Sequence, residues 1–187
     1  MSDSKSKHYL DLAARVASPG FGYAEPNPLV GAVIVKNDQV IGVGHHRRYG
    51  DIHAERDAIA NCIANRHDSK DATLYCTLEP CSHTGKQPPC TEAVIAAGIA
   101  KVVIASRDPH DLSSGGWSIL EAAGIEVQLS PSSENATHLS QPFLHRVATG
   151  RPWLIAKWAQ TLDGRIATRT GESQWISNPR CRRRVHR

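Results

Sequence analysis

Apolar segments of two different periodicities alternate along this chain, and their order constrains the fold more than any other feature. Two β-branched runs, 29–35 and 39–44, flank the polar segment Lys36–Asp38, and this pattern predicts a β-hairpin. Segments with helical and strand periodicity then follow in turn, with helices expected over 53–66, 88–98 and 117–124 and strands over 72–80, 100–106 and 125–129. A further helix is expected over 6–17. This order predicts an α/β fold, a three-layer α/β/α arrangement whose mixed sheet has an antiparallel first pair and parallel strands after it.

Two of these segments show which side chains should face the core. Leu74, Cys76 and Leu78 alternate along the 72–80 strand and should share one face of it. Apolar side chains recur at helical spacing along the 53–66 helix and should share one face of it: Ala54, Ala58, Ile59, Cys62 and Ile63.

The chain changes character near Gly150–Arg151, where we place a domain boundary. Before it, helical character resumes over 135–149, although Pro142 should kink or split that helix. After it, the segment 151–187 contains three of the four Trp residues and two Gly turns. We therefore predict one domain over 1–150 and a second, incomplete one over 151–187.

Charge and composition exclude several classes of protein. The formal charge of +4 comes from the end of the chain, since removing the five Arg of the last eight residues leaves 17 basic against 18 acidic side chains. A near-neutral body argues against a nucleic-acid partner. The sequence has no apolar run of about 18 residues and its start lacks an apolar signal region, so we expect no membrane association and a cytoplasmic location. Five Cys cannot all pair within one chain, which in a reducing compartment favours metal binding over disulfides.

A His, a Glu and two Cys fall where secondary-structure elements begin or end. His53 and Glu55 lie at the start of one expected helix, Cys81 follows a strand, and Cys90 opens the next helix. Neutral imidazole and thiolates are ligands that suit zinc better than magnesium or calcium. A helix N-terminus also stabilises a thiolate through its unpaired N–H groups. These residues therefore predict a zinc site formed by His53, Cys81 and Cys90.

Three protein ligands indicate a catalytic zinc site, because they leave the fourth tetrahedral position open for water. Bound zinc lowers the pKa of water from about 15.7 toward 7, and Glu55 is close enough to accept its proton without being a ligand. A structural site would recruit a fourth ligand, for which His83 is the nearest candidate. The remaining Cys62 and Cys76 are expected to be small buried side chains.

The segments that carry these residues resemble a known family. Zinc deaminases carry H-x-E followed by P-C-x-x-C; this chain has "HAE" and "EPCSHTGKQPPC", with eight residues between its two Cys. Together with "EPNPLVGAVIVK" and "RYGDIHAE", these segments resemble the pyrimidine deaminase of riboflavin biosynthesis, the N-terminal half of a bifunctional deaminase–reductase with a cytidine-deaminase-like fold. The family usually has Thr before the final "PPC", where this chain has Gln87.

The resemblance implies a function and assigns roles to individual residues. It implies one zinc ion held by His53, Cys81 and Cys90, with Glu55 as the catalytic proton shuttle. The implied reaction is hydrolytic deamination of a diaminopyrimidinone carrying a ribosylamino 5′-phosphate, with release of ammonia. The resemblance places Asn27 against the substrate, and three further positions around the sugar-phosphate pocket: His46, His83 and Lys86.

The segment "AKWAQTLDGRIATRTGESQWIS" resembles the opening of the reductase half, which uses NADPH. Ala159, Ser173 and Trp175 match positions near the cofactor or substrate of that half. A nucleotide-binding α/β domain needs several strands and helices, more than 151–187 can supply. We therefore expect no reductase activity, and NADPH binding only if the rest of that domain were present.

Two other functions remain open from the residues. The same zinc chemistry could act on cytosine or adenine in a nucleoside or RNA, although the near-neutral body argues against RNA. Alternatively, the zinc could stabilise a non-catalytic module that docks on a partner. Homo-oligomer formation is possible in either case.

Overall fold

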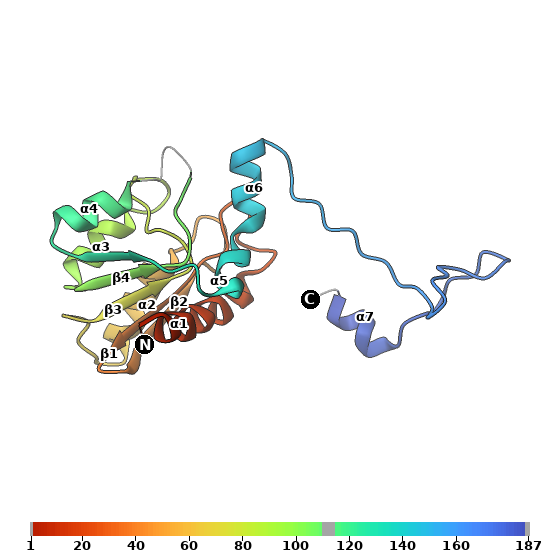
Figure 1. The fold of residues 1–187 in the computed structure, drawn as a ribbon, viewed down its shortest axis with the longest axis horizontal. Coiled ribbons are helices and arrows are strands. Elements are labelled where there is room, and N and C mark those ends of the chain that lie inside the picture. The colour runs from red at the N-terminus through yellow and green to blue at the C-terminus, as the bar shows by residue number, and fades with distance from the viewer. Residues whose placement is uncertain (1, 110–114, 186–187) are drawn as a thin grey trace. The chain divides into compact units, whose positions relative to one another are not determined.

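The computed structural model describes residues 2–109 and 115–185, and these form two compact units, one ending at Trp153 and the other beginning at Leu154. The first unit contains all the strands that the structure describes (Figure 1). Its elements follow one another in the order α1 (Ser2–Ala17), η1 (Ser18–Gly20), β1 (Gly31–Lys36), β2 (Gln39–His45), α2 (Ala54–Ala64), β3 (Thr73–Cys76), α3 (Cys90–Ala96), β4 (Lys101–Ile104), α4 (Gly116–Ala122), β5 (Glu126–Leu129), α5 (Glu134–Leu139) and α6 (Gln141–Thr149).

The five strands form one mixed sheet in the order β2-β1-β3-β4-β5. β1 pairs antiparallel with both β2 and β3, whereas β3, β4 and β5 run parallel to one another. The hairpin between β1 and β2 turns at Asn37 and Asp38, which both have positive φ angles, as a two-residue hairpin turn requires. The sequence-based prediction of the fold class is confirmed, including the antiparallel first pair.

Helices cover both faces of the sheet, so the first unit has three layers (Figure 1). On one face, α1 and α5 pack against side chains that include Val33, Tyr75 and Val103. On the other face, α2, α3 and α4 pack against alternate residues of the same strands, including Ile34, Leu74 and Val102. Leu74, Cys76 and Leu78 all lie on this second face, as their alternation predicts.

The close approach of α2 to the edge strand β2 determines where the start of α2 lies. A Cβ atom at Gly44 would lie 2.2 Å from the backbone nitrogen of Ala58, and one at Gly42 would lie 2.6 Å from its carbonyl oxygen. The glycines therefore let the helix backbone contact the strand. Ala54, Ala58 and Cys62 form this narrow contact, whereas Ile63 is 66% exposed. The prediction that Ile63 shares a face with the other four is wrong, because a helix this close buries a narrow stripe and turns Ile63 outward.

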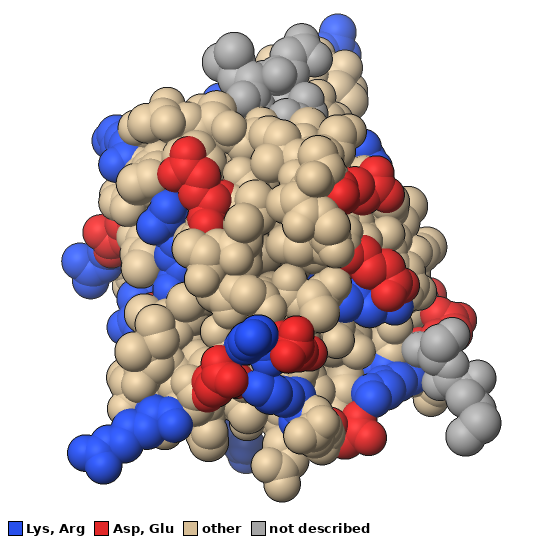
Figure 2. Space-filling model, turned by 90° about the vertical axis from the view of Figure 1, so that its left-hand side faces the viewer, with Lys and Arg blue, Asp and Glu red and all other residues tan. Residues whose placement is uncertain are grey.

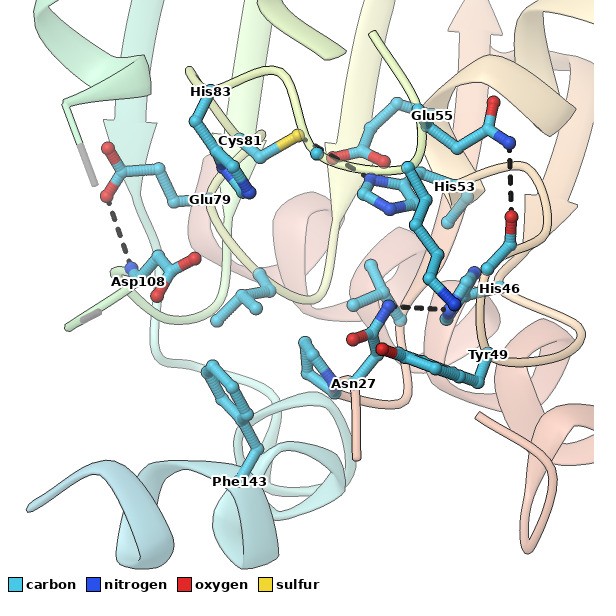
Figure 3. A pocket seen from close by; sticks show the side chains of 18 residues that line it. Asn27, His46, Tyr49, His53, Glu55, Glu79, Cys81, His83, Asp108 and Phe143 are labelled. Atoms are coloured by element: carbon cyan, nitrogen blue, oxygen red, sulfur yellow. Dashed lines mark hydrogen bonds between the residues drawn. The ribbon is translucent and has the colours of Figure 1, made fainter. Parts of the chain in front are cut away.

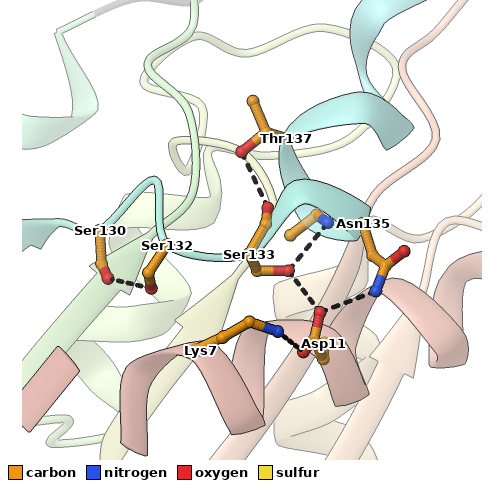
Figure 4. A network of polar contacts seen from close by, with 8 residues as sticks. Lys7, Asp11, Ser130, Ser132, Ser133, Asn135 and Thr137 are labelled. Carbon is orange, nitrogen blue, oxygen red and sulfur yellow. Dashed lines mark hydrogen bonds and ion pairs between the residues drawn. The ribbon is translucent and has the colours of Figure 1, made fainter. Parts of the chain in front are cut away.

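A polar network joins α1 to the start of α5 (Figure 4). One carboxylate oxygen of Asp11 accepts hydrogen bonds from Ser133 Oγ (2.7 Å) and Asn135 Nδ2 (2.9 Å), and the other accepts one from Lys7 Nζ (2.7 Å). Ser133 is also the N-cap of α5, since its hydroxyl oxygen accepts from the Ala136 N–H. The network thus holds α5, and the chain that continues into α6, against α1.

The helical segment predicted over 135–149 is split into α5 and α6, as Pro142 predicts. Ser140 ends α5 and serves as the N-cap of α6, and Pro142 lies in the first turn of α6, where its missing N–H has no helical acceptor. This break lets Phe143 and Leu144 of α6 pack against the same core as α2, α3 and α4.

The second unit has a different character. Within the described residues, its regular structure is the helix α7 (Pro179–Val185). Large apolar side chains are exposed along it: Leu154, Ile155, Trp158, Ile166 and Trp175. Arg182 of α7 lies over the ring of Trp175, with its guanidinium carbon 4.1 Å from the ring centroid.

Charged side chains of both signs are interspersed on the face shown in Figure 2. The described side chains of this face therefore do not form a basic stripe of the kind that follows a nucleic-acid backbone. Among the described residues, no helix combines the length and apolar character that crossing a bilayer requires.

Candidate metal centre and active site

The three residues predicted as ligands meet at the ends of secondary-structure elements. His53 is the N-cap of α2, Cys81 follows β3 in the chain, and Cys90 is the first residue of α3. The Nδ1 atom of His53 lies 3.5 Å from Sγ of Cys81 and 3.4 Å from Sγ of Cys90. All three donor atoms lie within 4.8 Å of one another, and both Cys side chains are buried.

This geometry fits a tetrahedral zinc ion. Zn–S bonds of about 2.3 Å and a Zn–N bond of about 2.0–2.1 Å at tetrahedral angles place nitrogen and sulfur about 3.6 Å apart. The two observed N···S distances are close to that value. Among the described residues, no further His, Cys, Asp or Glu side chain joins this group. His83, the candidate for a fourth ligand, instead lies in the pocket wall, so the donor set is that of a site with an open position.

The start of α3 stabilises a thiolate, and that thiolate is Cys81. The backbone N–H of Cys90 donates to Sγ of Cys81 at 3.4 Å. The pKa of the Cys81 thiol is lowered by hydrogen bonding from the Cys90 thiol and from His53, against the opposing effect of burial. The same hydrogen bond and burial raise the pKa of Cys90. A divalent cation between the two sulfurs would balance the negative charge of both thiolates, so the pKa values of Cys81 and Cys90 would no longer be shifted in opposite directions.

Glu55 lies beside this group and is buried, with 4% of the residue exposed. It is the second residue of α2, so the first turn of the helix, which follows the N-cap His53, brings it next to the three donors (Figure 3). Burial raises the pKa of Glu55 to about 7, and the negative charge of Cys81 adds to this while His53 opposes it. A buried carboxyl group placed in this way can both accept and donate a proton.

A cavity of about 370 Å³ opens in front of these residues. This volume is within the range of small-molecule sites. Its lining includes every predicted substrate-binding residue: Asn27, His46, His83 and Lys86. In Figure 3, Asn27, His46 and Tyr49 lie on one side of the cavity, and Glu79, Asp108 and Phe143 on the other.

A chain of hydrogen bonds fixes the orientation of Asn27. Nδ1 of His46 lies 3.1 Å from the carbonyl oxygen of Ile52, and Nε2 lies 3.2 Å from Nδ2 of Asn27. A carbonyl oxygen only accepts, so Nδ1 carries the proton and Nε2 accepts from the Asn27 amide. Burial lowers the pKa of His46, which favours this neutral form. His46 therefore orients Asn27 so that the amide oxygen faces away from His46 (Figure 3).

Glu79, which was not among the predicted site residues, orders the opposite wall. Its buried carboxylate accepts hydrogen bonds from the N–H groups of Trp117 (2.9 Å) and Asp108 (3.3 Å), and it pairs with Nε of Arg107 at 2.9 Å. Glu79 thus ties the start of α4 and the residues after β4 to the segment that carries Cys81. Its place two residues before Cys81 was the available sequence signal.

Other lining residues that the sequence analysis did not select are Tyr49, Asp108 and Phe143. They come from the β2–α2 loop, the segment after β4 and α6. Their proximity depends on how these elements pack, and no local spacing in the sequence indicates it.

The residues assigned to a reductase half are placed in the second unit. Ala159 is partly buried, whereas Ser173 and Trp175 are exposed. Their roles stay predictions.

Comparison with known proteins agrees with the geometry of the metal centre. Residues 3–106 match the cytidine and deoxycytidylate deaminase zinc-binding region, and residues 152–187 match the RibD C-terminal domain. The chain is 45% identical over 181 residues to the riboflavin biosynthesis protein RibD of Aquifex aeolicus, covering 96% of this chain and 50% of that protein. It is 43% identical over 182 residues to RibD of Escherichia coli, covering 97% of this chain and 49% of the relative. The chain thus spans about half the length of the curated relatives it matches.

Solved structures show the same fold. A diaminohydroxyphosphoribosylaminopyrimidine deaminase/5-amino-6-(5-phosphoribosylamino)uracil reductase from Thermotoga maritima matches with a TM-score of 0.91 and 40% identity, over 100% of this chain and 53% of the other. The Rib2 deaminase of Aspergillus oryzae matches with a TM-score of 0.57 and 21% identity, over 75% of this chain and 98% of the other, which supports the fold alone.

Proposed function

Since this chain belongs to the family defined by the cytidine and deoxycytidylate deaminase zinc-binding region, we propose that it is a zinc-dependent hydrolase acting in riboflavin biosynthesis. Its reaction is the deamination of 2,5-diamino-6-ribosylamino-pyrimidinone 5′-phosphate to the 5-amino-6-ribosylamino-uracil 5′-phosphate, with release of ammonia. The observation that carries this proposal is the meeting of His53, Cys81 and Cys90 beside the buried Glu55, with His53, Cys81 and Glu55 lining one cavity. The similarity to RibD proteins supports the choice of substrate.

Three residues would hold the metal: Nδ1 of His53 and the sulfurs of Cys81 and Cys90. When bound, zinc supplies Lewis acidity that lowers the pKa of water and so makes a hydroxide nucleophile available near neutral pH. The protein holds the ligands at the starts of two helices and at a strand end, and buries both thiolates. These elements set the ligand positions before the substrate binds.

Glu55 moves the protons. In the proposed reaction, hydroxide forms a bond to the amino-bearing ring carbon, and Glu55 transfers the proton taken from water to the adjacent ring nitrogen. Glu55 then takes the proton of the new hydroxyl group and delivers it to the amino group. The carbon–nitrogen bond breaks, ammonia leaves and a carbonyl remains. The oxygen and the two hydrogen atoms that the products contain beyond the substrate all come from water. Burial at 4% exposure keeps bulk solvent from exchanging these protons.

The cavity wall would bind the rest of the substrate. The oriented oxygen of Asn27 can accept a hydrogen bond from an N–H group of the pyrimidine. His83 and Lys86 lie in the loop after Cys81 and can contact the sugar phosphate, with Lys86 as a positive charge. His46 lines the same pocket and also orients Asn27 through its hydrogen bond.

The remaining parts of the proposal concern the whole chain. We propose that residues 1–150 form the deaminase domain and that 151–187 begin an NADPH-dependent reductase domain, in which Ala159, Ser173 and Trp175 lie near cofactor or substrate. The match of residues 152–187 to the RibD C-terminal domain supports this division. We also propose a cytoplasmic location, which suits five free Cys, and assembly into a homo-oligomer.

Ammonia release tests the proposed substrate. The full chain, at measured zinc content, is incubated with the diaminopyrimidinone ribosylamino phosphate, with cytidine and with transfer RNA. We expect ammonia from the first substrate only. Ammonia from cytidine or RNA alone would favour a nucleoside or RNA deaminase, and no ammonia from any of them would favour a non-catalytic zinc module.

A further inference from the structure

Two loops contribute exposed residues to the lining of the cavity, and we call this side its mouth; side chains join the two loops. The 46–52 loop connects β2 to α2, and the 82–89 loop connects Cys81 to α3. Gln87 donates from Nε2 to the carbonyl oxygen of Gly50 at 3.1 Å. Arg56, in the first turn of α2, donates to the carbonyl oxygens of Pro88 (3.2 Å) and Pro89 (3.0 Å). The 82–89 loop is therefore fastened to α2 and to the neighbouring loop immediately before Cys90.

Lys86, the residue before Gln87, lies against the same neighbouring loop. Its ammonium nitrogen is 3.9 Å from the centroid of the Tyr49 ring, a distance at which the ring attracts the cation. The backbone of Tyr49 is itself held by a hydrogen bond from its N–H to the carbonyl oxygen of Tyr23 at 2.9 Å. The backbone that carries the Tyr49 ring is thus held in place, and the ring lies beside Lys86 in the cavity lining.

Gly50 leaves the space in which the Lys86 side chain lies. It has a φ of +86°, and a Cβ atom there would lie 3.2 Å from Cδ and 3.6 Å from Nζ of Lys86. The glycine therefore serves both the turn and the close approach of the lysine. The same residue accepts the hydrogen bond from Gln87, so one turn positions two consecutive residues of the other loop.

We propose that Gln87 and Tyr49 are positioning residues that hold the ammonium group of Lys86 at the mouth of the cavity, where it selects a phosphorylated substrate over its dephosphorylated counterpart. A free lysine side chain has many rotamers, and its ordering opposes ligand binding. Holding Lys86 over Tyr49 before the ligand arrives removes part of that cost. Gln87 contributes by fixing the backbone from which Lys86 extends. This inference rests on the proposed function for the identity of the substrate.

Kinetics with two substrates test the selection. Gln87→Ala and Tyr49→Leu are compared with the unaltered chain on the phosphorylated pyrimidinone and on the same compound without phosphate. Loss of one hydrogen bond predicts a roughly two- to tenfold higher KM for the phosphorylated compound in Gln87→Ala. Loss of the ring predicts a roughly two- to fivefold higher KM in Tyr49→Leu. The KM for the dephosphorylated compound, kcat and zinc content should not change.

Gln39→Ala, which removes an exposed glutamine at the start of β2, is the matched control and should behave as the unaltered chain. Tyr49→Phe keeps a ring under the lysine, so it should raise the KM for the phosphorylated compound less than Tyr49→Leu does. An equal rise of KM for both compounds would overturn the proposal, because it would show a general distortion of the cavity.

A second measurement does not require catalysis, so it separates this inference from the proposed substrate. Lysines of the full chain are dimethylated with ¹³C, and the Lys86 signal is assigned by its loss in Lys86→Arg. Stacking on Tyr49 predicts an upfield ring-current shift of that signal, which should persist in Tyr49→Phe and vanish in Tyr49→Leu. Titration with ribose 5-phosphate should move the same signal. A Lys86 signal without an upfield shift in the unaltered chain, or one that ribose 5-phosphate leaves unmoved, would overturn the positioning role whatever the enzyme deaminates.

Discussion

Replacing Glu55 with Gln should abolish ammonia release while the metal centre stays intact. The substitution keeps the size of the side chain and removes its ability to take a proton. Positioned proton transfer contributes about 10²- to 10⁴-fold to a rate, which corresponds to about 2.7–5.4 kcal/mol of barrier. The loss should lie near the upper end, because Glu55 serves two transfers and the residue is only 4% exposed, so that solvent cannot replace it.

The assay measures ammonia release under saturating substrate together with zinc content by mass spectrometry of the intact protein. Glu92→Gln is the matched control, since Glu92 is an exposed carboxylate in the first turn of α3. It should retain both zinc and activity. If Glu55→Gln kept more than about a tenth of the activity, the role of Glu55 as proton shuttle would be refuted. A loss of less than about tenfold is smaller than the contribution of general acid–base catalysis.

Two further predictions concern the framework that carries the site. Gly44→Ala should lower the free energy of unfolding by about 1–3 kcal/mol in urea denaturation, since its Cβ would lie 2.2 Å from Ala58 N; unchanged stability would show that α2 can move away from β2 freely. Asp11→Asn should lower stability by about 1 kcal/mol at pH 7, because hydrogen bonds from Lys7 and then Ser133 lower the pKa of Asp11 from 3.8 to about 2. A carboxylate with a lowered pKa stabilises the fold above pH 4 and loses this effect as the pH falls toward 2. The difference in the free energy of unfolding between the unaltered chain and Asp11→Asn should therefore shrink over that window. A difference that stays constant would contradict this.

The fold follows from periodicity wherever a segment has one surface to bury. The alternation of Leu74, Cys76 and Leu78 predicts the face that β3 presents to α2 and α3, and Pro142 predicts the break between α5 and α6. Periodicity failed at Ile63, because Gly42 and Gly44 bring α2 so close to β2 that only small residues fit between them. A helix–strand distance is a property of two packed elements, which the pattern of one element does not contain.

The metal centre could be predicted because its chemistry depends on residue types at element ends. His53, Cys81 and Cys90 lie at such ends, and the structure brings their donor atoms together. The hydrogen bond from the Cys90 N–H to the sulfur of Cys81 could not be predicted, since it depends on how the 82–89 loop returns toward β3. The contacts of the Glu79 carboxylate could not be predicted either, since its hydrogen-bond donors come from segments that follow a different strand.

The most direct test of the account is X-ray absorption at the zinc edge of the purified full chain. A centre held by His53, Cys81 and Cys90 should contain one zinc per chain with two sulfur neighbours at about 2.3 Å and two lighter neighbours at about 2.0–2.1 Å. One of the lighter neighbours should be an imidazole nitrogen and the other an exchangeable oxygen. Replacing Cys81 with Ala should remove the metal. A shell of three or four sulfurs, or a fourth ligand supplied by the protein, would contradict the claim that this centre keeps a position open for water.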